Sequence, residues 1–434
     1  MMENQSKMHT DKPIPAGFKL TEVGVIPEDW AVERLSMITE PKRPISYGIV
    51  QTGPSVVNGI PCIRVVDISN GKIQTDNLIT TSEKISASYR RTILQKDDVL
   101  IPLRGKVGEV AIVDKYTQGA NLTRGVALIA PKSSYDSRYV KQYLSCKDSA
   151  DRFLASMNGS ALQEITIATL RHFYLALPSS LEEQIAIGNV LSDTDLLITE
   201  LEKLIGKKQA IKTATMQQLL SGRTRLPQFS KYHDGTIKDY KTSELGKIPK
   251  DWKITSIGDL FSISAGGDLR VDEFSDIKSE LHPHPIYSNA ISNLGLYGYC
   301  QSYDYIGDYL TITARGGIGH AVARKGSFCA IGRLLVLNPK GTSNVKFFEE
   351  YINQYLSFAN ESTGVPQLTA PQVAKYLVNC PSIEEQTAIA TILSDMDAEL
   401  SILEQKLAKV RDLKQGMMQQ LLTGRIRLPL EQQT

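Results

Sequence analysis

Cysteines are scarce and scattered in this sequence. The 434 residues include five, an odd number, and no two of them form a Cys-x-x-Cys pair. The framework of a disulfide-stapled secreted domain and the paired thiolates of a zinc site are therefore both missing. The sequence also lacks a run of about 18 apolar residues, which a membrane helix requires. Met1–Thr10 lacks the apolar core of a signal peptide. We predict a cytoplasmic protein with reduced cysteines and no membrane contact.

Catalytic motifs are missing as well. There is no Walker loop, no Asn-Pro-Pro-Phe/Tyr motif of adenine methylation, no glycine-rich S-adenosylmethionine loop and no Pro-Asp start of a nuclease carboxylate pattern. The stretch Arg315–Gly319 is rich in glycine, but it lacks the Gly-Lys-Ser/Thr ending of a phosphate loop. His282 and His284 have no cysteine or carboxylate pattern nearby that would complete a zinc sphere. We predict no catalytic residue, no metal site and no cofactor site in this chain.

Neither sign of charge dominates the chain. The formal net charge is +2 at pH 7, so any basic surface must come from local positions and not from the total. The length and an apolar fraction of 41% are typical of an ordered protein, and they favour two or three domains over a single core.

The sequence is rich in repeats. Residues 180–227 return at 382–429, with many identical positions at one constant offset, which indicates an internal duplication. Each copy begins with a Ser-x-x-Glu capping box and ends with a glycine that is followed by a proline. Because these are helix start and stop signals, each copy predicts one long helix, on the order of 60 Å at 1.5 Å per residue.

The second helix carries the spacing of a coiled-coil seam. Lys212 and Lys414 occupy the same seam position in the two copies, where burial of an unpaired ammonium group would be costly. We expect the helices to diverge there or the lysines to meet a polar partner; a register-setting role and an exposed helix end both stay open. The seam is weaker in the first copy, and in the second it comprises Ile389, Met396, Leu403, Val410 and Met417.

A shorter repeat precedes each globular part of the chain. Gly24–Trp30 returns as Gly246–Trp252, and these two segments contain the only tryptophans of the protein. We interpret each segment as a clip at the start of a domain, anchored by a packed indole ring.

Two β-rich segments, at about 31–178 and 253–380, lie between the clips and the helices. They contain short apolar runs bounded by turn residues, and Asn70-Gly71 between two such runs is typical of a hairpin. The segments resemble each other less than the helices do, but they share a frame. The corresponding stretches are Asp97–Gly108 with Asp308–Gly319, Asn121–Pro131 with Cys329–Pro339, and Gly159–Thr166 with Gly364–Thr369.

This arrangement resembles the specificity (S) subunit of a type I restriction-modification system over nearly the whole chain. The duplicated Glu-Glu-Gln openings and Gln-Gln-Leu-Leu-Ser/Thr-Gly-Arg endings of the helices carry the resemblance. It implies an α+β fold in which two β-rich target-recognition domains are separated by two long antiparallel coiled-coil helices, with an internal pseudo-twofold duplication. We expect a flexible leader at 1–16, target-recognition domain 1 at 17–178, helical spacer 1 at 179–227, a linker at 228–242, target-recognition domain 2 at 243–380 and helical spacer 2 at 381–434.

The resemblance also implies a function. It is that of a non-catalytic subunit that reads an asymmetric, bipartite site in double-stranded DNA, one half per domain, and holds two methyltransferase (M) subunits and restriction (R) subunits. S-adenosylmethionine, ATP and Mg²⁺ are expected in those partners, which methylate adenine and cleave DNA, and not in this chain. The competing hypothesis is a non-DNA adaptor with two β-rich binding domains on a coiled coil, which the near-zero net charge would suit.

Candidate DNA-binding residues lie on or beside glycine-rich turns. Arginine can pair with guanine, asparagine and glutamine with adenine, and hydroxyl groups with phosphate oxygens. The ordinary alternative for each is a solvated side chain near a turn, and we interpret most tyrosines of the second domain as core residues. The candidates are Arg104, Lys106, Asn121, Thr123, Arg124 and Gln163 in the first domain, and Ser288, Asn289, Arg315, Arg324, Arg333 and Gln367 in the second.

Overall fold

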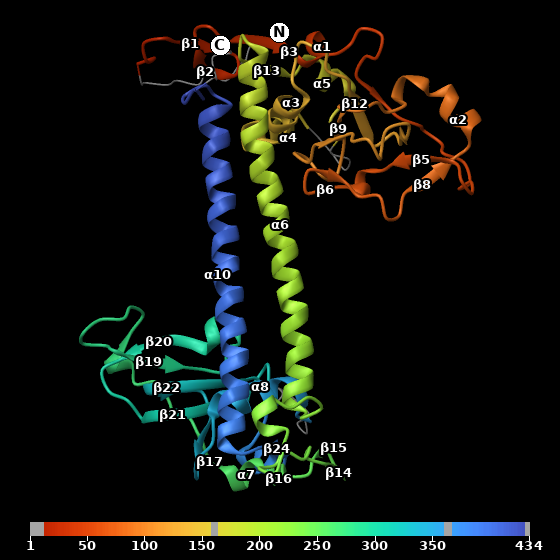
Figure 1. The fold of residues 1–434 in the computed structure, drawn as a ribbon. Coiled ribbons are helices and arrows are strands. Elements are labelled where there is room, and N and C mark those ends of the chain that lie inside the picture. Colours follow the sequence, from red (N-terminus) through yellow and green to blue (C-terminus); the bar gives the residue numbers. More distant parts are fainter. Residues whose placement is uncertain (1–12, 158–163, 360–366, 430–434) are drawn as a thin grey trace. The chain divides into compact units, whose positions relative to one another are not determined.

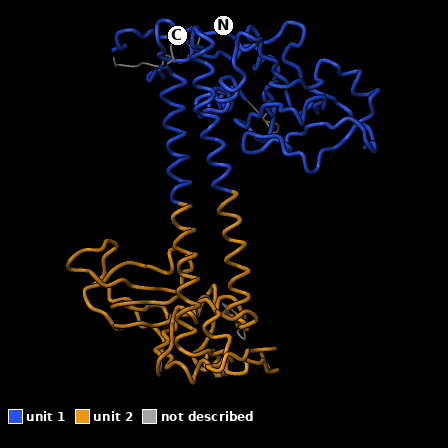
Figure 2. Tube along the Cα trace, in the orientation of Figure 1, with its two compact units in different colours: residues 1–202, 405–434 blue, residues 203–404 orange. Residues whose placement is uncertain are grey.

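The structure, a computed structural model, describes residues 13–157, 164–359 and 367–429 (Figure 1). The chain divides into two compact units (Figure 2): unit 1 combines Met1–Glu202 with Gln405–Thr434, and unit 2 is the continuous segment Lys203–Glu404. The two long helices, α6 (Leu181–Leu220) and α10 (Ile383–Leu421), each contribute one part to each unit. Each unit therefore contains one β-rich domain and portions of both repeats.

Unit 1 is built from short strands around two small sheets. One sheet has the strand order β10-β9-β12-β4 and the other the order β11-β5-β8. Asn70 and Gly71 both have positive φ and join β6 to β7, which confirms the predicted hairpin. The elements are β1 (Phe18–Thr21), β2 (Gly24–Pro27), β3 (Ala31–Arg34), α1 (Leu35–Ile38), β4 (Ser46–Tyr47), β5 (Ile60–Ile63), β6 (Ile68–Ser69), β7 (Lys72–Ile73), β8 (Ile79–Thr81), α2 (Glu83–Ser88), β9 (Val99–Pro102), β10 (Ala111–Ile112), β11 (Asn121–Leu122), β12 (Val126–Ile129), α3 (Ser137–Ser145), α4 (Lys147–Ser156), α5 (Ile167–His172) and β13 (Tyr174–Leu177).

Unit 2 has one larger sheet of seven strands, in the order β17-β23-β21-β22-β19-β20-β18. Its centre is the long antiparallel pair β21–β22, whose register runs from Tyr305 opposite Phe328 to Ile312 opposite Ala321. The elements are β14 (Tyr240–Ser243), β15 (Gly246–Pro249), β16 (Lys253–Ser256), α7 (Ile257–Leu260), β17 (Phe261–Ala265), β18 (Phe274–Ser275), β19 (His284–Tyr287), β20 (Leu296–Cys300), β21 (Tyr305–Ile312), β22 (Ala321–Ala330), β23 (Leu335–Pro339), α8 (Val345–Tyr355), α9 (Ala370–Ala374) and β24 (Leu377–Cys380).

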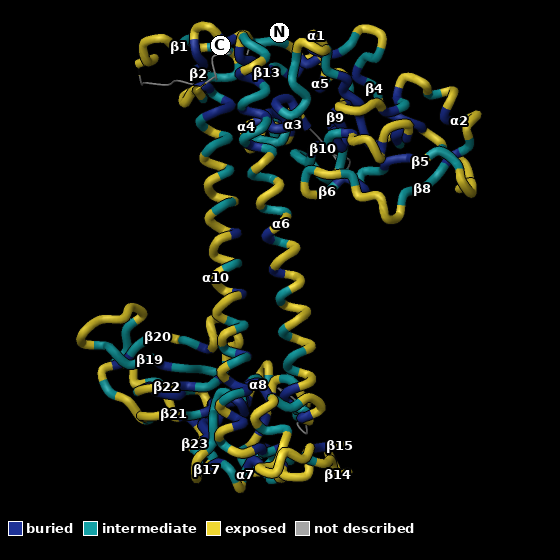
Figure 3. Tube along the Cα trace, viewed as in Figure 1, coloured by how far each residue is buried: buried dark blue, intermediate teal, exposed yellow. Residues whose placement is uncertain are grey.

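The two long helices run antiparallel within each unit. In unit 1, Asp195 and Glu202 of α6 pair with Lys414 and Arg411 of α10, so the residue number falls on one helix as it rises on the other. The helices are antiparallel in unit 2 as well, because Lys208 and Lys212 of α6 pair with Glu399 and Asp397 of α10. Buried residues recur along both long helices (Figure 3) with the four- and seven-residue spacing of a seam, which confirms the predicted coiled coil; they include Ile187, Leu191, Leu201, Ile205, Ile389, Leu393, Leu400 and Leu407.

Both seam lysines have found a polar partner, which is one of the two expected outcomes. Lys414 lies 2.6 Å from Asp195 in unit 1, and Lys212 pairs with Asp397 at the equivalent place in unit 2. Asp195 also accepts a hydrogen bond from Gln142 at 2.8 Å, which ties α3 to the helix. Burial opposes ionisation of Asp195, but Lys141, which lies 3.0 Å away, together with Lys414 and Gln142 outweighs it and lowers the pKa of this carboxyl group.

Each clip packs on the end of the helix from the other repeat. Gly424, which follows α10, has φ +65 and lies so close to Pro27 and Trp30 that a Cβ atom there would overlap both. The corresponding Gly222 in unit 2 would place a Cβ atom 2.6 Å from Pro249. Both tryptophans are 1% exposed, which confirms their packing role. Glycine is required at these two helix ends for its left-handed conformation and for its lack of a side chain.

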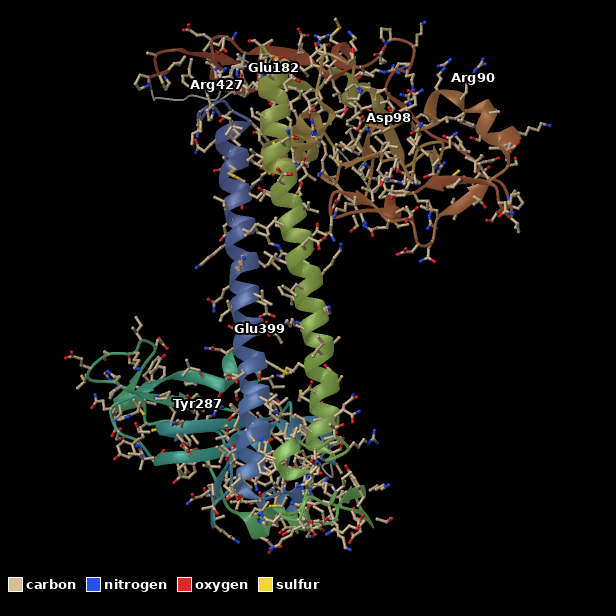
Figure 4. All side chains as sticks on the ribbon, viewed as in Figure 1. Arg90, Asp98, Glu182, Tyr287, Glu399 and Arg427 are labelled. Carbon is tan, nitrogen blue, oxygen red and sulfur yellow. The ribbon has the colours of Figure 1, made fainter. Side chains whose placement is uncertain are left out.

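The repeated Glu-Glu-Gln and Gly-Arg-x-Arg motifs meet at these helix ends. In unit 1, the guanidinium of Arg427, which is labelled in Figure 4, donates hydrogen bonds to Glu183 at the start of α6 and to Asp29 of the clip. The hydrogen bond from Arg427 lowers the pKa of Asp29. We call these three residues and their unit 2 counterparts, Arg225, Glu385 and Asp251, the clasps.

The glutamine of each motif fixes the start of its helix. Gln184 donates from Nε2 to the carbonyl of Pro178 and accepts from the backbone N–H of Asp136. In unit 2, Gln386 donates to Pro381 and accepts from Asn344 in the same way. The Glu-Glu-Gln and Gly-Arg-x-Arg motifs therefore have a structural role. In each unit they join the end of one long helix to the start of the other, although these segments are far apart in the sequence.

Candidate nucleic-acid interface

Four loops of unit 2 are joined to one another by hydrogen bonds. The turn after β21 presents Arg315, which is exposed and forms an isolated β-bridge with Gln367. The amide of Asn289 joins two more segments, because Nδ2 donates to the carbonyl of Gly332 at 2.6 Å and Oδ1 accepts from the N–H of Ala314 at 2.7 Å. The loops 288–295, 314–319, 331–333 and 367–369 thus form a single cluster, which we call loop cluster 2.

Three predicted residues of unit 2 have exposed side chains in loop cluster 2. These residues are Arg315, Arg333 and Gln367. Arg333 holds the tip of its turn in the left-handed region, with φ +64. Among the described residues neither arginine forms an ion pair with a carboxylate, so both guanidinium groups offer donors to a ligand.

Arg324 takes a different role from the one expected. It is 6% exposed, and it donates from Nε to the hydroxyl of Thr311 and from a terminal nitrogen to the carbonyl of Leu294. Its guanidinium carbon lies 3.7 Å from the ring centroid of Tyr287, which is labelled in Figure 4. Burial lowers the pKa of Arg324. This arginine supports loop 288–295 from inside and presents no guanidinium face to a ligand.

Two other predicted residues of unit 2 also hold loops in place. The backbone N–H of Ser288 donates to the carbonyl of Gly295 at 2.8 Å, and its hydroxyl group is directed to the same carbonyl. Asn289 uses both ends of its amide to join neighbouring loops. Both residues position the cluster and are less available to bases than the exposed arginines.

Unit 1 has a corresponding loop cluster. Arg104 follows β9 and forms an isolated β-bridge with Glu164, at the position that matches Arg315 and Gln367. Arg124 is exposed, and its N–H donates to the carbonyl of Ile49. We call loops 64–67, 103–108, 123–125 and 164–165 loop cluster 1.

The remaining predicted residues of unit 1 are less exposed. Asn121 is fully buried, where Nδ2 donates to the hydroxyl of Ser86 and Oδ1 accepts from Thr92, so it packs the core and does not face a ligand. Lys106 donates to the carbonyl of Ile68 at 2.7 Å, and Thr123 is half-buried with its hydroxyl on the carbonyl of Ile63. Gln163 lies outside the described residues.

The backbone of the two clusters follows one plan. Ile165 donates to the carbonyl of Leu103 at 2.7 Å, and Leu368 donates to that of Ala314 at 2.8 Å. The glycine directly after the arginine has φ +73 in unit 1 and +77 in unit 2, and the glycine at the end of each turn has φ +87 and +91. Because these bonds and torsions recur at matched positions, the duplication extends from the helices into the β-rich domains, as the shared sequence frame predicts.

Exposed aliphatic residues within the clusters escaped the sequence interpretation. They are Val66 in unit 1 and Ile291 and Leu294 in unit 2, each more than half exposed. Apolar residues in β-rich segments are normally assigned to the core, so composition gave no signal. The available signal was turn context: Ser-Asn and Asn-Leu-Gly surround Ile291 and Leu294, and a turn residue is seldom buried.

Residues 13–157, 164–359 and 367–429 contain neither a membrane-spanning helix nor a metal-binding cluster. No helix there is long and apolar enough to cross a membrane. No group of three or more histidine, cysteine, aspartate or glutamate residues in the same ranges is placed to hold a metal ion.

Comparisons with known proteins give a consistent result. The family model described as "Type I restriction modification DNA specificity domain" matches residues 27–213 and 249–412. The putative type I restriction enzyme MjaX specificity subunit of Methanocaldococcus jannaschii is 27% identical over 431 residues, which cover 95% of this chain and 97% of the relative. The type I restriction enzyme EcoBI specificity subunit of Escherichia coli is 29% identical over 198 residues, 45% of this chain and 41% of the relative. Among solved structures, the S subunit of a type I restriction-modification system from M. genitalium aligns with a TM-score of 0.61 at 16% identity, covering 90% of this chain and 96% of that one, which shows a shared fold.

Proposed function

The chain belongs to the type I restriction-modification DNA specificity family, and from this membership we propose that it reads a bipartite site in duplex DNA through its two loop clusters. Membership itself establishes a role in DNA sequence recognition within a restriction-modification complex, as a non-catalytic subunit. The form of the site, the residues that contact it and the subunits that assemble on the chain belong to the proposal.

The observation that carries the proposal is that the two loop clusters share one backbone frame but carry different side chains. Loop clusters 1 and 2 share backbone bonds and glycine torsions, but Glu164 stands in one where Gln367 stands in the other. A carboxylate accepts from cytosine N4, whereas a glutamine amide can pair with adenine. Two domains of one frame with different reading groups suit two different half-sites. We therefore propose an asymmetric target, one half for each of the domains at 17–178 and 243–380.

The exposed arginines have two tasks available to them. A guanidinium can donate two parallel bonds to guanine O6 and N7, or it can hold a phosphate and fix the register of the protein on the duplex. Arg124 in unit 1 and Arg315 and Arg333 in unit 2 are the proposed contacts, with half-buried Arg104 beside them. Asn121 and Arg324 are excluded from this set because both are buried.

The paired helices provide a means of fixing the gap between half-sites. A continuous helix of 40 residues is about 60 Å long, which corresponds to roughly 18 base pairs at 3.4 Å each. We propose that this length determines the unread spacer. We propose further that two methyltransferase subunits and the restriction subunits assemble on the chain, and that S-adenosylmethionine, ATP and Mg²⁺ bind to them in the cytoplasm and not to this chain.

A matched pair of substitutions tests the proposal. Arg124→Ala and Arg315→Ala should each weaken or relax one half-site and leave the other intact, as read by genome-wide methylation mapping in a host that expresses the chain with its methyltransferase subunit. If both variants changed the same half, or neither changed any base, the two-cluster reading would be wrong.

The non-DNA adaptor is distinguished by the salt dependence of binding. If the chain binds DNA, the affinity should fall as the salt concentration rises. A variant that loses one phosphate contact should then show a plot of log affinity against log salt that is less steep by about 0.9. An adaptor that does not bind DNA would show no retention on duplex DNA at any salt concentration.

A further inference from the structure

The tip of loop 288–295 in unit 2 combines exposure with backbone strain. Asn293 and Leu294 have φ +48 and +50, and the side chain of Leu294 is 58% exposed. The left-handed region disfavours a residue with a Cβ atom, and a bulky leucine is unusual there. Leu294 gains little from burial in return. Strained residues of this kind persist where the surroundings fix them, and they cluster at functional sites.

Three contacts fix this loop from below. Arg324, itself buried, donates to the carbonyl of Leu294 at 2.7 Å. Gly295 closes the loop with φ +78, and a Cβ atom there would lie 2.7 Å from the carbonyl oxygen of Ser288. Ile291, which is 54% exposed, lies over Gly317 of the Arg-Gly turn, where a Cβ atom would come within 2.6 Å of its Cδ1. Ile291 is therefore held against the turn that carries Arg315, and the backbone of Leu294 is held in place by Arg324.

Loop cluster 1 presents an aliphatic side chain at the matching place. Thr123 donates to the carbonyl of Ile63 as Ile331 donates to that of Tyr287, so the loops after β5 and β19 correspond. In the first of these loops Val66 is 63% exposed, while its neighbour Val65 packs over Gly125. Both corresponding loops thus present an exposed aliphatic side chain, although the glycine covered by the loop is Gly125 in unit 1 and Gly317 in unit 2.

We propose that Leu294 and Ile291 in loop cluster 2, and Val66 in loop cluster 1, are specificity-determining residues that contact the C5-methyl group of thymine in the major groove. The inference rests on the proposed function and adds an apolar component to its reading groups. The C5-methyl group is the one apolar feature by which a base pair can be identified in that groove, and aliphatic side chains recognise it by contact. The neighbouring arginines supply the bonds to phosphates or guanine that bring these side chains to the base edge.

Deoxyuridine provides the direct test because it differs from thymidine only by this methyl group. The full chain, assembled with its methyltransferase subunits, is measured on target duplexes in which each thymine of a mapped half-site is replaced in turn. Wild type should lose about fourfold in affinity at one or more positions, because a single methyl group loses its apolar contact. Leu294→Ala should bind thymine and deoxyuridine duplexes equally at the position it contacts, because the partner group is already gone.

Two further variants separate contact from folding. Leu294→Asn keeps a residue that tolerates the left-handed region, so it should unfold at the same or a higher temperature and still lose discrimination at that thymine. Leu281→Ala removes an equally exposed leucine of unit 2, 65% exposed, and should leave every deoxyuridine effect unchanged. Arg315→Ala should reduce the salt slope, whereas Leu294→Ala should not.

The outcomes distinguish the inference from its premise. If the wild-type complex binds no duplex in a salt-dependent manner, the proposed function fails. If it reads a bipartite site but no deoxyuridine position depends on Leu294, Ile291 or Val66, the proposed function stands and the methyl contact is refuted.

Discussion

The two clasps should differ in strength although they share the same residue types. Arg225 and Glu385 have side chains only 4% and 2% exposed, and Glu385 also accepts a hydrogen bond from Nε1 of Trp252 at 3.0 Å. Arg225→Ala would leave Glu385 charged and buried with one neutral donor. Breaking a buried pair in this way costs about 3–5 kcal/mol, which would lower the Tm of a unit of this size by roughly 6 °C or more.

The arginine of the unit 1 clasp is open to water. The side chain of Arg427 is 44% exposed, and Nε1 of Trp30 has no hydrogen-bond partner among the described residues. Asp29 is 54% exposed, so water can replace the arginine on that side and Arg427→Ala should cost less than Arg225→Ala; Glu183, at 3% exposed, still loses its charged partner, so the cost should exceed that of a surface pair. The predicted difference in strength between the two clasps therefore follows from side-chain burial, because the motif residues are the same in both.

Each unit contains one of the two tryptophans, which makes the comparison measurable. A Trp30→Phe background reports the unfolding of unit 2 through Trp252, and a Trp252→Phe background reports unit 1 through Trp30. The tryptophan that remains is 1% exposed in either case, so its emission should shift on unfolding. Equal losses of Tm for Arg225→Ala and Arg427→Ala, or a larger loss for Arg427→Ala, would refute the reasoning.

The ion pairs of unit 1 and the length of the helices can each be perturbed as well. The pKa of Asp29 is lowered by Arg427, and that of Asp195 is lowered by its two lysines. Each carboxylate therefore contributes stability that is complete above its unfolded pKa near 4 and is lost as pH falls through its lower folded pKa. The Tm of unit 1 should fall below pH 4, and Asp29→Asn should make the Tm less dependent on pH. Leu204 and Lys406 are equivalent positions of the two repeats, and inserting four residues after both should preserve the ion pairs on either side and lengthen the helices by about 6 Å. Methylation mapping should then show an unread spacer that is longer by one or two base pairs. An unchanged spacer would refute the proposed role of the helices.

The sequence predicted the helices well because their signals are local. The capping boxes, the seven-residue spacing and the helix-ending glycines need no knowledge of the rest of the chain. The partner of Lys414 was open for the opposite reason, since Asp195 is more than 200 positions away. The same distance hid the clasps, whose arginine, glutamate and aspartate come from three separate segments.

The candidate site was predicted less completely. The turns carrying Arg124, Arg315 and Arg333 are exposed, because turn chemistry places them on the surface. Asn121 and Arg324 lie beside similar turns, but their side chains face inward, and a residue type near a turn does not reveal this direction. Leu294 was missed because its left-handed conformation depends on Arg324 and Gly295, which act together only in the folded domain.

The division of the chain into a split and a continuous unit has a consequence for its synthesis. Unit 2 is complete once Glu404 has left the ribosome, whereas the core of unit 1 includes Leu421 and Leu422 from the far end. At typical translation rates of roughly 5–20 residues per second, the first domain to emerge waits about 10–40 s, while the 202 residues of unit 2 are made, before its last core residues arrive. A nascent chain that stops directly after residue 404 therefore contains all of unit 2 and lacks the last core residues of unit 1.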